Sequence, residues 1–381
     1  MAGISNTEVT KRIYLDYNAS TPLDPEVLQE MLPFFEQHYG NPSSSHWASA
    51  SLQETIEQAR RRIAEAIGAN TNEVIFTSGG TEANNHALKG VYFASTQPRR
   101  HIITTTIEHP AILNPCAFLE TLGAEVTYVP VDHWGRVSPA DIERAIREDT
   151  ILISVMHANS EVGTIQPIEE ATSIAKRYGI LMHTDAAQSL GKIPVNVDVL
   201  GVDLLSIAGH KLYAPKGIGA LYVREGTAIA PFVHGADHES GRRAGTENVP
   251  YIVGLGKAAA LAAQKTDSRE IRNLRKALKE GLKAAFGNRV RFNGDPDNHL
   301  PNTLNVSFLG LSGQEILSRC PEIAASTGSA CHSGSTTLSP VLRAMGLSDY
   351  EGLGAIRFSL GRYTTAEEVE TVIALFQDRL Q

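Results

Sequence analysis

Residues 180–223 read ILMHTDAAQSLGKIPVNVDVLGVDLLSIAGHKLYAPKGIGALYV, and this stretch decides the fold. The apolar run at 180–182 stops abruptly at a histidine, an aspartate and a glutamine, as a buried strand does when it ends at a site. A second strand-like run at 203–207 leads into Lys211, and a turn then returns the chain as an apolar strand over 218–223. The pattern predicts a lysine between two strands, on a short turn whose glycines let backbone approach a ligand.

Lys211 is the strongest candidate for a catalytic residue. A free lysine amine has a pKa of about 10.4, so it becomes a nucleophile at neutral pH only where burial or a nearby cation lowers that value. We expect His210 and the dry strand end to supply both. The usual partner of such a lysine is a carbonyl cofactor, and pyridoxal phosphate needs an acid beside its ring nitrogen, for which Asp185 is the candidate. The alternative is that Asp185 caps a helix and Lys211 is a solvated loop lysine.

Four blocks of sequence, in the right order along the chain, resemble the class V, fold-type I pyridoxal-phosphate enzymes, and within them the cysteine desulfurases and selenocysteine lyases. The blocks are YLDYNASTPLDPEV (14–27), HTDAAQSLGK (183–192), GHKLYAPKGIGALYV (209–223) and RFSLGRYTTAEEV (357–369). The resemblance implies an α/β fold, with a large cofactor-binding domain whose mostly parallel sheet is flanked by helices. We expect this domain at 17–260, and a smaller α+β domain that carries the nucleophile loop at 1–16 and 261–381.

Length and composition agree with a soluble enzyme of two domains. The chain has 381 residues, against roughly 150 per domain, and 42% of them are hydrophobic. The formal net charge is −8 with dispersed basic residues, so neither nucleic acid nor a membrane surface is an expected partner. Three cysteines are an odd number for a disulfide framework, and the N-terminal residues resemble no signal peptide. We expect a cytoplasmic protein without a metal site.

Helices are predicted from their apolar patterns and stop signals at 25–39, 48–67, 250–263 and 268–286. The run Arg60-Arg61-Arg62 is expected on the solvated face of the second helix. The last two helices carry the chain from the first domain into the second, with a boundary near residue 260.

A phosphate site is predicted where an apolar strand at 73–76 breaks into TSGGTE and a helix follows at 83–92. A strand, a glycine pair, a hydroxyl and a helix in this order can bind an anion, because free N–H groups and the helix dipole converge on it. By resemblance, Gly80 and Thr81 bind the cofactor phosphate. Many glycine-rich turns of this kind bind nothing, which is the alternative.

Further cofactor contacts rest on the resemblance alone. It implies that His109 stacks its imidazole on the pyridine ring, that Gln188 donates to the phenolic oxygen and that His210 binds the phosphate. The family usually shows two asparagines before a glutamate, the second reaching the cofactor's phenolic oxygen or the substrate carboxylate. This chain has Asn159 and then Ser160, so the contact belongs to one or the other.

Two other positions concern the phosphate. Many relatives carry a serine three residues before the lysine, where this chain has Ala208, so one hydrogen bond is missing or has moved to Ser206 or the backbone. The loop at 233–248 combines three glycines, two arginines and a hydroxyl, which suits an anion. In relatives it crosses a dimer interface, so the resemblance implies a homodimer in which Thr246 binds the phosphate held by the other subunit.

A second chemical centre is predicted at 324–337, where small and polar residues surround Cys331. Exposure suits a thiolate that must travel to a substrate and attack it. The resemblance makes Cys331 the nucleophile that takes up the substrate sulfur as a persulfide, and Lys211 the proton shuttle at the substrate α-carbon and β-carbon. Cys116 and Cys320 are interpreted as packing residues.

The substrate carboxylate is assigned to Arg357, which resembles the family's carboxylate clamp, a task suited to a planar guanidinium. Arg362 is the alternative at the end of the same strand. Asn18 lies in a loop that resembles the substrate-side entry segment of the family.

Three hypotheses for function follow. The first is a cysteine desulfurase that converts L-cysteine to L-alanine and passes sulfur to an acceptor protein, for iron–sulfur clusters, thionucleosides or another cofactor. The second is a selenocysteine lyase acting on L-selenocysteine, favoured by Cys331-His332, by Asp16-Tyr17-Asn18 and by Ala208. The third is a sulfur-carrier scaffold with weak catalysis, against which the joint presence of Asp185, Lys211 and Cys331 argues.

Overall fold

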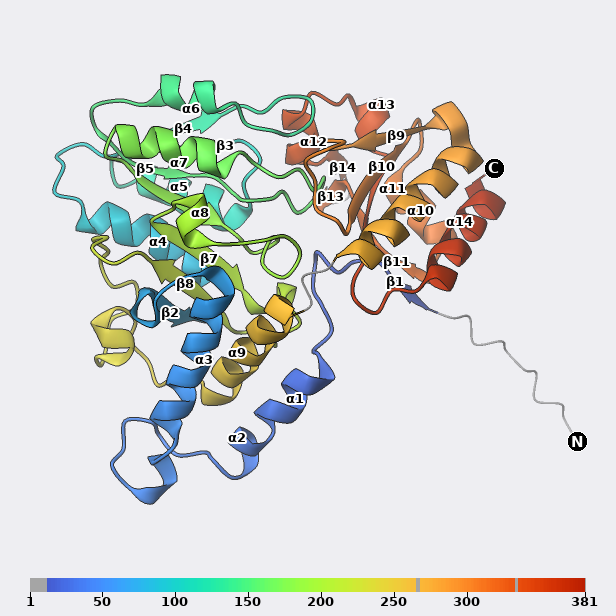
Figure 1. Cartoon of the computed structure of the whole chain (residues 1–381). Helices are drawn as coiled ribbons and strands as arrows, with labels where there is room; N and C mark the ends of the chain where they lie inside the picture. The colour runs from blue at the N-terminus through green and yellow to red at the C-terminus, as the bar shows by residue number, and fades with distance from the viewer. Residues whose placement is uncertain (1–11, 265–267, 333–334, 381) are drawn as a thin grey trace, which may run out of the picture.

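The computed structural model describes residues 12–264, 268–332 and 335–380, with the backbone alone at 329–332 and 335–336. Seven strands form the larger sheet, in the order β2-β8-β7-β6-β5-β3-β4 (Figure 1). Strand β8 is antiparallel to both neighbours, and the pairs among β7, β6, β5, β3 and β4 are all parallel. The bounds in sheet order are Val74–Thr77, Gly219–Val223, Leu204–Ala208, Leu181–Asp185, Thr150–Ser154, His101–Thr105 and Glu125–Val129. The expected mostly parallel sheet is confirmed.

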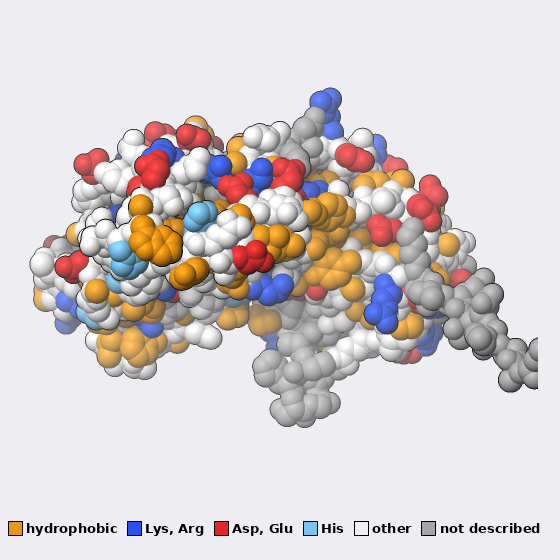
Figure 2. All heavy atoms as spheres, turned by 90° about the horizontal axis from the view of Figure 1, so that it is seen from below, with side chains coloured by type: hydrophobic (Ala, Val, Ile, Leu, Met, Phe, Trp, Pro, Cys, Tyr) orange, Lys and Arg blue, Asp and Glu red, His pale blue; other side chains and the backbone are white. Residues whose placement is uncertain are grey.

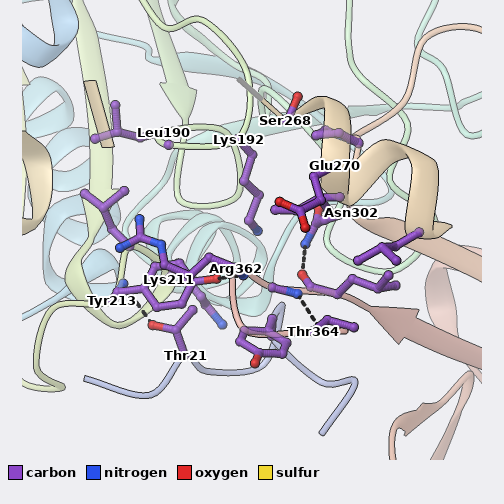
Figure 3. Close-up of a pocket in the computed structure, with 18 residues that line it drawn as sticks. Thr21, Leu190, Lys192, Lys211, Tyr213, Ser268, Glu270, Asn302, Arg362 and Thr364 are labelled. Carbon is purple, nitrogen blue, oxygen red and sulfur yellow. Dashed lines mark hydrogen bonds between the residues drawn. The ribbon is translucent and has the colours of Figure 1, made fainter. Parts of the chain in front are cut away.

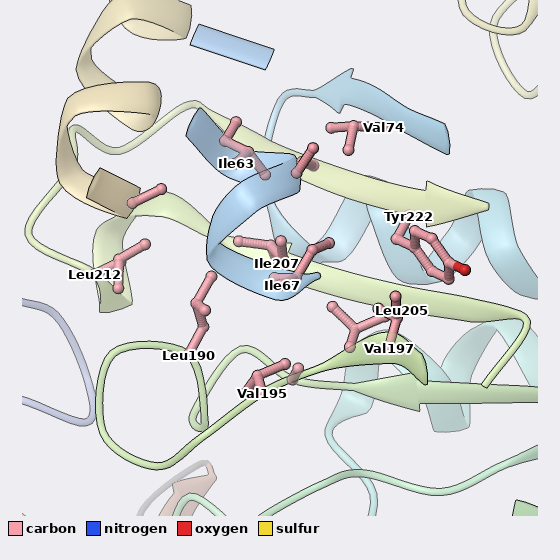
Figure 4. Close-up of a cluster of buried hydrophobic side chains, with 14 of the residues drawn as sticks. Ile63, Ile67, Val74, Leu190, Val195, Val197, Leu205, Ile207, Leu212 and Tyr222 are labelled. Carbon is pink, nitrogen blue, oxygen red and sulfur yellow. The ribbon is translucent and has the colours of Figure 1, made fainter. Parts of the chain in front are cut away.

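Helices cover both faces of this sheet because successive strand residues point to opposite sides. Ile102, Leu152 and Leu204 pack on one face, against α4 (Gly80–Ala94) and α5 (Pro110–Glu120). The next residues along the same strands, Ile103, Ile153 and Leu205, pack on the other face. There they join the core beneath α3 (Leu52–Ile67), α7 (Ile168–Arg177) and α9 (Val249–Gln264), part of which is drawn in Figure 4.

A smaller antiparallel sheet lies beside the first, in the order β12-β15-β10-β9 (Figure 1). Its strands span Ser326–Thr327, Ala355–Ser359, Thr303–Phe308 and Val290–Asn293. Helices α10 (Arg269–Phe286) and α14 (Ala366–Leu380) pack on it, and Phe376 meets Phe308 and Phe358 at ring-centroid distances of 5.5 Å. The short strand β1 (Ile13–Tyr14) pairs in parallel with β11 (Ile323–Ala324), so the start of the described chain joins this second unit.

The other elements are short. Strands β13 (Ser329–His332) and β14 (Ser335–Leu338) pair antiparallel as a hairpin that forms a separate two-stranded sheet. The remaining α-helices are α1 (Pro25–Met31), α2 (Pro33–Glu36), α6 (Pro139–Ala145), α8 (Val197–Leu200), α11 (Gly313–Arg319), α12 (Pro340–Ala344) and α13 (Asp349–Gly352). Single 3₁₀ turns occur at η1 (Trp47–Ser49), η2 (Thr71–Glu73), η3 (Gly209–Lys211), η4 (His238–Gly241) and η5 (Gly287–Arg289). Within the described ranges, no helix combines the length and apolar character needed to cross a bilayer.

Two sequence expectations about helices are wrong in detail. The helix expected at 25–39 is two helices, α1 and α2, because Pro33 lacks an N–H and its ring disfavours a continuous helix through that position. Arg60 is not on a solvated face: it is buried, and its guanidinium donates to both carboxylate oxygens of Glu239 at 2.6 and 3.0 Å. The apolar period of α3 could not reveal this, since Glu239 lies far along the chain.

The division into two domains stays a prediction. Each sheet has its own hydrophobic cluster, which is what two domains require. The expected boundary near residue 260 falls inside α9.

Candidate active site

The carboxyl ends of the parallel strands open onto one cavity of about 720 Å³. This is where ligands bind in open α/β sheets, because loops diverge there and leave a crevice. The cavity also receives side chains from the loop after β1 and from β15 of the smaller sheet. It brings together most of the residues predicted from the sequence, namely Asn18, Gly80, Thr81, His109, Ser160, Asp185, Gln188, His210, Lys211 and Arg357.

One end of the cavity is the N-terminus of α4, a fifteen-residue helix that begins at Gly80. The first N–H groups of a helix have no intrahelical partner and carry the positive end of its dipole, so they suit an anion. Gly79 before it has a φ of 151°, a conformation that residues with a side chain rarely adopt. A Cβ on Gly80 would lie 3.0 Å from the Cβ of Ala208, a tight contact, so a side chain there would push β7 and the helix apart by a few tenths of an ångström.

Asp185 ends β6 and lies within the same cavity. Its Oδ2 accepts a hydrogen bond from Asn84 Nδ2 at 2.7 Å, and its Oδ1 accepts the Ala187 N–H at 2.9 Å. The residues that follow form turns rather than a helix, so Asp185 is not a helix cap. Its carboxylate is held in one orientation by α4 and by its own turn.

Lys211 is half-buried on η3, and its Nζ donates to the backbone carbonyls of Asn18 and Ala19 at 2.7 and 2.8 Å. Burial, followed by the positive charge of Arg357, lowers the pKa of this amine to about 8, against the opposing effects of Asp185 and Asp16. His210 is not the expected cation, because burial lowers its own pKa to about 4 and leaves it neutral at pH 7. The solvated-loop alternative for Lys211 does not fit this environment.

His109 caps the N-terminus of α5 and faces the cavity. Its Nδ1 accepts the Ala111 N–H at 3.0 Å, so in the neutral ring the proton is on Nε2. The preceding residue, Glu108, is buried and accepts from Thr105 Oγ1 at 2.7 Å and from the Met156 N–H at 3.0 Å. These bonds join the loops that follow β3 and β5, and thereby fix the position of His109.

Three predicted residues have other surroundings. The amide of Asn159 is used inside its own loop, where Oδ1 accepts the N–H groups of Glu161 and Val162, so the geometry favours Ser160 for a contact in the cavity. Ser206 is fully buried and its hydroxyl bonds His183 Nε2 at 3.0 Å, away from the cavity lining. Thr246 lines a separate cavity of about 180 Å³.

The two candidate arginines are clearly separated. Arg357 faces the large cavity and is held by Asp16 Oδ1 at 2.7 Å, by Ser326 Oγ at 2.8 Å and by the Ser160 carbonyl at 3.2 Å. Arg362 lines a different cavity and is paired with Asp24 at 2.6 Å. The geometry therefore favours Arg357 for a carboxylate in the large cavity.

Cys331 lies on β13, and its side chain is outside the part of the chain that the structure describes. The base of its hairpin is described: the Ser339 N–H donates to the Gly328 carbonyl, and Ser339 Oγ donates to Glu161 Oε2 at 2.6 Å. Glu161 follows Ser160 directly, so the hairpin is tied to the loop that lines the large cavity. Cys116 and Cys320 are buried free thiols, which confirms their interpretation as packing residues.

Sequence reasoning gave no role in the site to Asn84, Asp16 or Lys192. Asn84 lies one helical turn after Gly80, so the two residues share a face of α4. This spacing could have placed Asn84 near the cavity. The Asp16–Arg357 pair joins residues from opposite ends of the chain. Lys192 Nζ bonds Gln188 Oε1 at 2.6 Å and Asn18 Oδ1 at 3.0 Å; it ends the block at 183–192, but no role was predicted for it from the sequence.

The residues present fit pyridoxal phosphate. Gly79 leaves open space at the start of α4, where a phosphate can meet N–H groups, and Asp185 offers an oriented carboxylate to a ring nitrogen. Lys211 lies in the same cavity with an amine that is partly unprotonated near neutral pH. An anion site, an acid and a reactive amine are the three functions that this cofactor needs.

Comparisons with known proteins agree with this chemistry. The family model described as Aminotransferase class-V matches residues 13–372. A cysteine desulfurase IscS of Dictyoglomus turgidum is 50% identical over 372 residues, which cover 96% of this chain and 94% of the relative. One of Methanosarcina thermophila is 47% identical over 375 residues, covering 97% and 92%.

Solved structures are similar over nearly the whole chain. A NifS-like protein superposes with a TM-score of 0.91 and 40% identity, covering 97% of this chain and 99% of that one. A structure described as SspA in complex with cysteine superposes with a TM-score of 0.81 and 40% identity, covering 93% and 100%.

Proposed function

This chain belongs to the aminotransferase class-V family, and from that membership we propose that it is a cysteine desulfurase that uses pyridoxal phosphate. The observation that carries the proposal is the position of Lys211. Its amine has a pKa lowered to about 8 and shares one cavity with Asp185 and with the N-terminus of α4. The names of the relatives supply the reaction class, and the cavity supplies groups suited to it.

The cofactor would be held by residues from three strand ends. The N–H groups at Gly80 and Thr81 would bind its phosphate, Asp185 would face its ring nitrogen and His109 would cover the ring. Pyridoxal phosphate, when bound through Lys211, supplies an electron sink for charge that develops at the α-carbon of an amino acid. Asn84 supports this arrangement because it keeps the Asp185 carboxylate in place.

Arg357 and Lys211 would act on the substrate itself. The Arg357 guanidinium would bind the α-carboxylate of L-cysteine, and Asp16 and Ser326 hold the guanidinium in position. Lys211 would remove the proton from the α-carbon and later return protons to the product. An amine whose pKa lies near the working pH can both accept and donate.

Cys331 would carry the sulfur. Its thiolate would attack the sulfur of the substrate, forming a new S–S bond while the substrate C–S bond breaks. The β-carbon then takes up a proton, so that L-cysteine and a thiol become L-alanine and a Cys331 persulfide with no external oxidant or reductant. A thiol acceptor, such as an acceptor protein, would attack the persulfide next and regenerate the Cys331 thiol. Such chemistry needs a reducing compartment, so we propose the cytoplasm.

A homodimer is part of the proposal. Trp47, Tyr39 and Phe35 are 82%, 70% and 53% exposed along one segment, and hydrophobic groups are visible among the charged residues on this face (Figure 2). Large exposed apolar side chains in sequence proximity favour a protein partner. Thr246 lines its own small cavity rather than the large one, which leaves it available to the phosphate of a second copy. Analytical ultracentrifugation of wild type and of Trp47→Ser tests the dimer.

Absorbance and sulfide release test the reaction. The purified protein should be yellow and release sulfide from L-cysteine in the presence of dithiothreitol. Lys211→Ala should abolish both properties, whereas Cys331→Ala should keep the colour and lose sulfide release, with Cys116→Ala as the matched control. Selenide release from L-selenocysteine that survives Cys331→Ala would favour a lyase, and a colourless wild type would favour a scaffold.

A further inference from the structure

A second, smaller cavity of about 210 Å³ is drawn in Figure 3. Lys211 lines both this cavity and the large one, so the two are neighbours. Its wall also includes Lys192, from the turn after β6, and Asn302, from the loop before β10. A lysine beside the reactive lysine has no place in the reaction described above. The contacts that it makes indicate its role.

The amine of Lys192 donates two hydrogen bonds to side-chain oxygens of the active site. Nζ lies 2.6 Å from Gln188 Oε1 and 3.0 Å from Asn18 Oδ1. An ammonium has three N–H groups and a neutral amine has two, so both bonds exist in either protonation state. As an ammonium, which has donors and no acceptor, Lys192 pairs with the oxygen end of each amide, and its two bonds are both to amide oxygens.

For Gln188, this contact decides whether the NH₂ group or the oxygen of the amide faces the large cavity. Because Oε1 faces Lys192, the NH₂ group lies on the other side, where Nε2 donates one bond to the Asn18 carbonyl at 2.9 Å. Nε2 carries a second N–H, and Gln188 lines the large cavity. The amide thus offers a donor there. A flipped amide would present an oxygen to the cavity instead, and the side chain would fill almost the same space.

For Asn18 the same contact completes a fully bonded side chain. Its Oδ1 also accepts from Asn302 Nδ2 at 3.0 Å, and its Nδ2 donates to the Ser160 carbonyl and to Thr303 Oγ1. Its backbone carbonyl accepts from Lys211 at 2.7 Å. Lys192 therefore stabilises the residue that joins the reactive lysine to the smaller sheet.

We propose that Lys192 is a positioning residue, which fixes the Gln188 amide so that its N–H group points to the phenolic oxygen of the bound cofactor. The inference rests on the proposed function, because it needs a pyridoxal phosphate in the large cavity. A donor at that oxygen stabilises its deprotonated form. Without Lys192 only the bond from Nε2 to the Asn18 carbonyl holds the amide, so the donor to the phenolic oxygen is fixed less firmly.

Other charged groups near Lys192 also influence the pKa values measured in any titration of this site. Burial lowers the pKa of Lys192 well below its ordinary value, and the positive charges of Lys211 and Arg357 lower it further. Glu270 and Arg362 line the same small cavity, and Arg362 is paired with Asp24. These groups are common to the wild type and to the variants below. Lys192→Met also removes the charge of Lys192 itself, and the double-mutant cycle below separates this effect from that of the amide.

The experiment is a pH titration of the visible absorbance of the holoprotein. Lys192→Met keeps the length of the side chain and removes its donors, and it should raise the midpoint by about one pH unit, the size expected for one lost hydrogen bond to a charged group. Lys192→Arg keeps donors and should shift the midpoint by less than half as much. Lys276→Met, on the exposed side of α10, is the matched control.

A double-mutant cycle separates positioning from general damage. If Lys192 acts through Gln188, Lys192→Met should cause no further shift in a Gln188→Leu background. An unchanged midpoint in Lys192→Met, or an equal shift in both backgrounds, would overturn the inference. If Lys192→Met does not fold, Gln188→Leu alone decides, since an unshifted midpoint there shows that the amide has no influence on the cofactor. A wild type without visible absorbance would instead refute the proposed function.

Discussion

The lowered pKa of Lys211 can be measured directly in protein stripped of cofactor. With a pKa of about 8, roughly one Lys211 amine in ten is unprotonated at pH 7, against about one in 2,500 for an ordinary lysine at 10.4. The free-amine fraction is therefore on the order of 200-fold larger. Burial is the main cause and Arg357 the second, so Arg357→Gln should raise the midpoint while leaving it below the ordinary value.

Competitive labelling with trace acetic anhydride between pH 6 and 11, read by mass spectrometry of peptides, gives this midpoint. Lys276 on the surface of α10 is the reference in the same digest, and Arg362→Gln is the control, because that guanidinium is paired with Asp24 outside the large cavity. A Lys211 midpoint above pH 10, or a midpoint that falls in Arg357→Gln, would refute the reasoning.

Three further predictions concern stability and cofactor retention. Burial raises the pKa of Glu108 from 4.5 to about 8, so the folded state keeps a proton that the unfolded chain releases, and stability should fall as the pH rises between these values. Urea unfolding of Glu108→Gln should show a flatter pH dependence, and an unchanged slope would contradict the assignment. Phe376→Ala should cost about 3–5 kcal/mol in the same measurement, because the ring is fully buried between Phe308 and Phe358; a loss below about 1 kcal/mol would show that the smaller core collapses around the gap. Asn84→Ala removes the amide bonded to Asp185 and should weaken pyridoxal phosphate retention in equilibrium dialysis by about tenfold or more, whereas equal retention would mean that the carboxylate needs no support.

Local patterns predicted the strand ends well because strand and turn signals act over a few residues. The run before Asp185 is β6, and the run before Lys211 is β7, so parallel pairing of these two strands brings both residues to one edge of the sheet. The same reasoning predicted a helix after β2 at 83–92, and the structure shows a longer helix that already begins at Gly80. The strand ends alone left alternatives open for Asp185 and Lys211. The resemblance to a family then supplied the expected pyridoxal-phosphate chemistry.

Predictions were weaker wherever a side chain chooses between partners. Nothing local distinguished Arg357 from Arg362, or Ser160 from Asn159, until the cavity showed which of each pair faces it. Arg60 has an amphipathic helical context like that of its neighbours, yet it pairs with Glu239 from a distant loop.

The sequence by itself determined the strands and helices that carry the site in the larger sheet, the lysine and the aspartate at two strand ends, and the family to which the chain belongs. Periodicity, glycine turns and contiguous motifs are local, so they can be read from neighbouring residues. Only the tertiary structure decided the electrostatics of the site: Arg357 rather than His210 as the cation near Lys211, Asn84 as the support of Asp185, and Lys192 behind Gln188. Each of these depends on burial and on contacts that the folded chain alone creates, because a charge or an amide responds to whatever lies within a few ångströms of it.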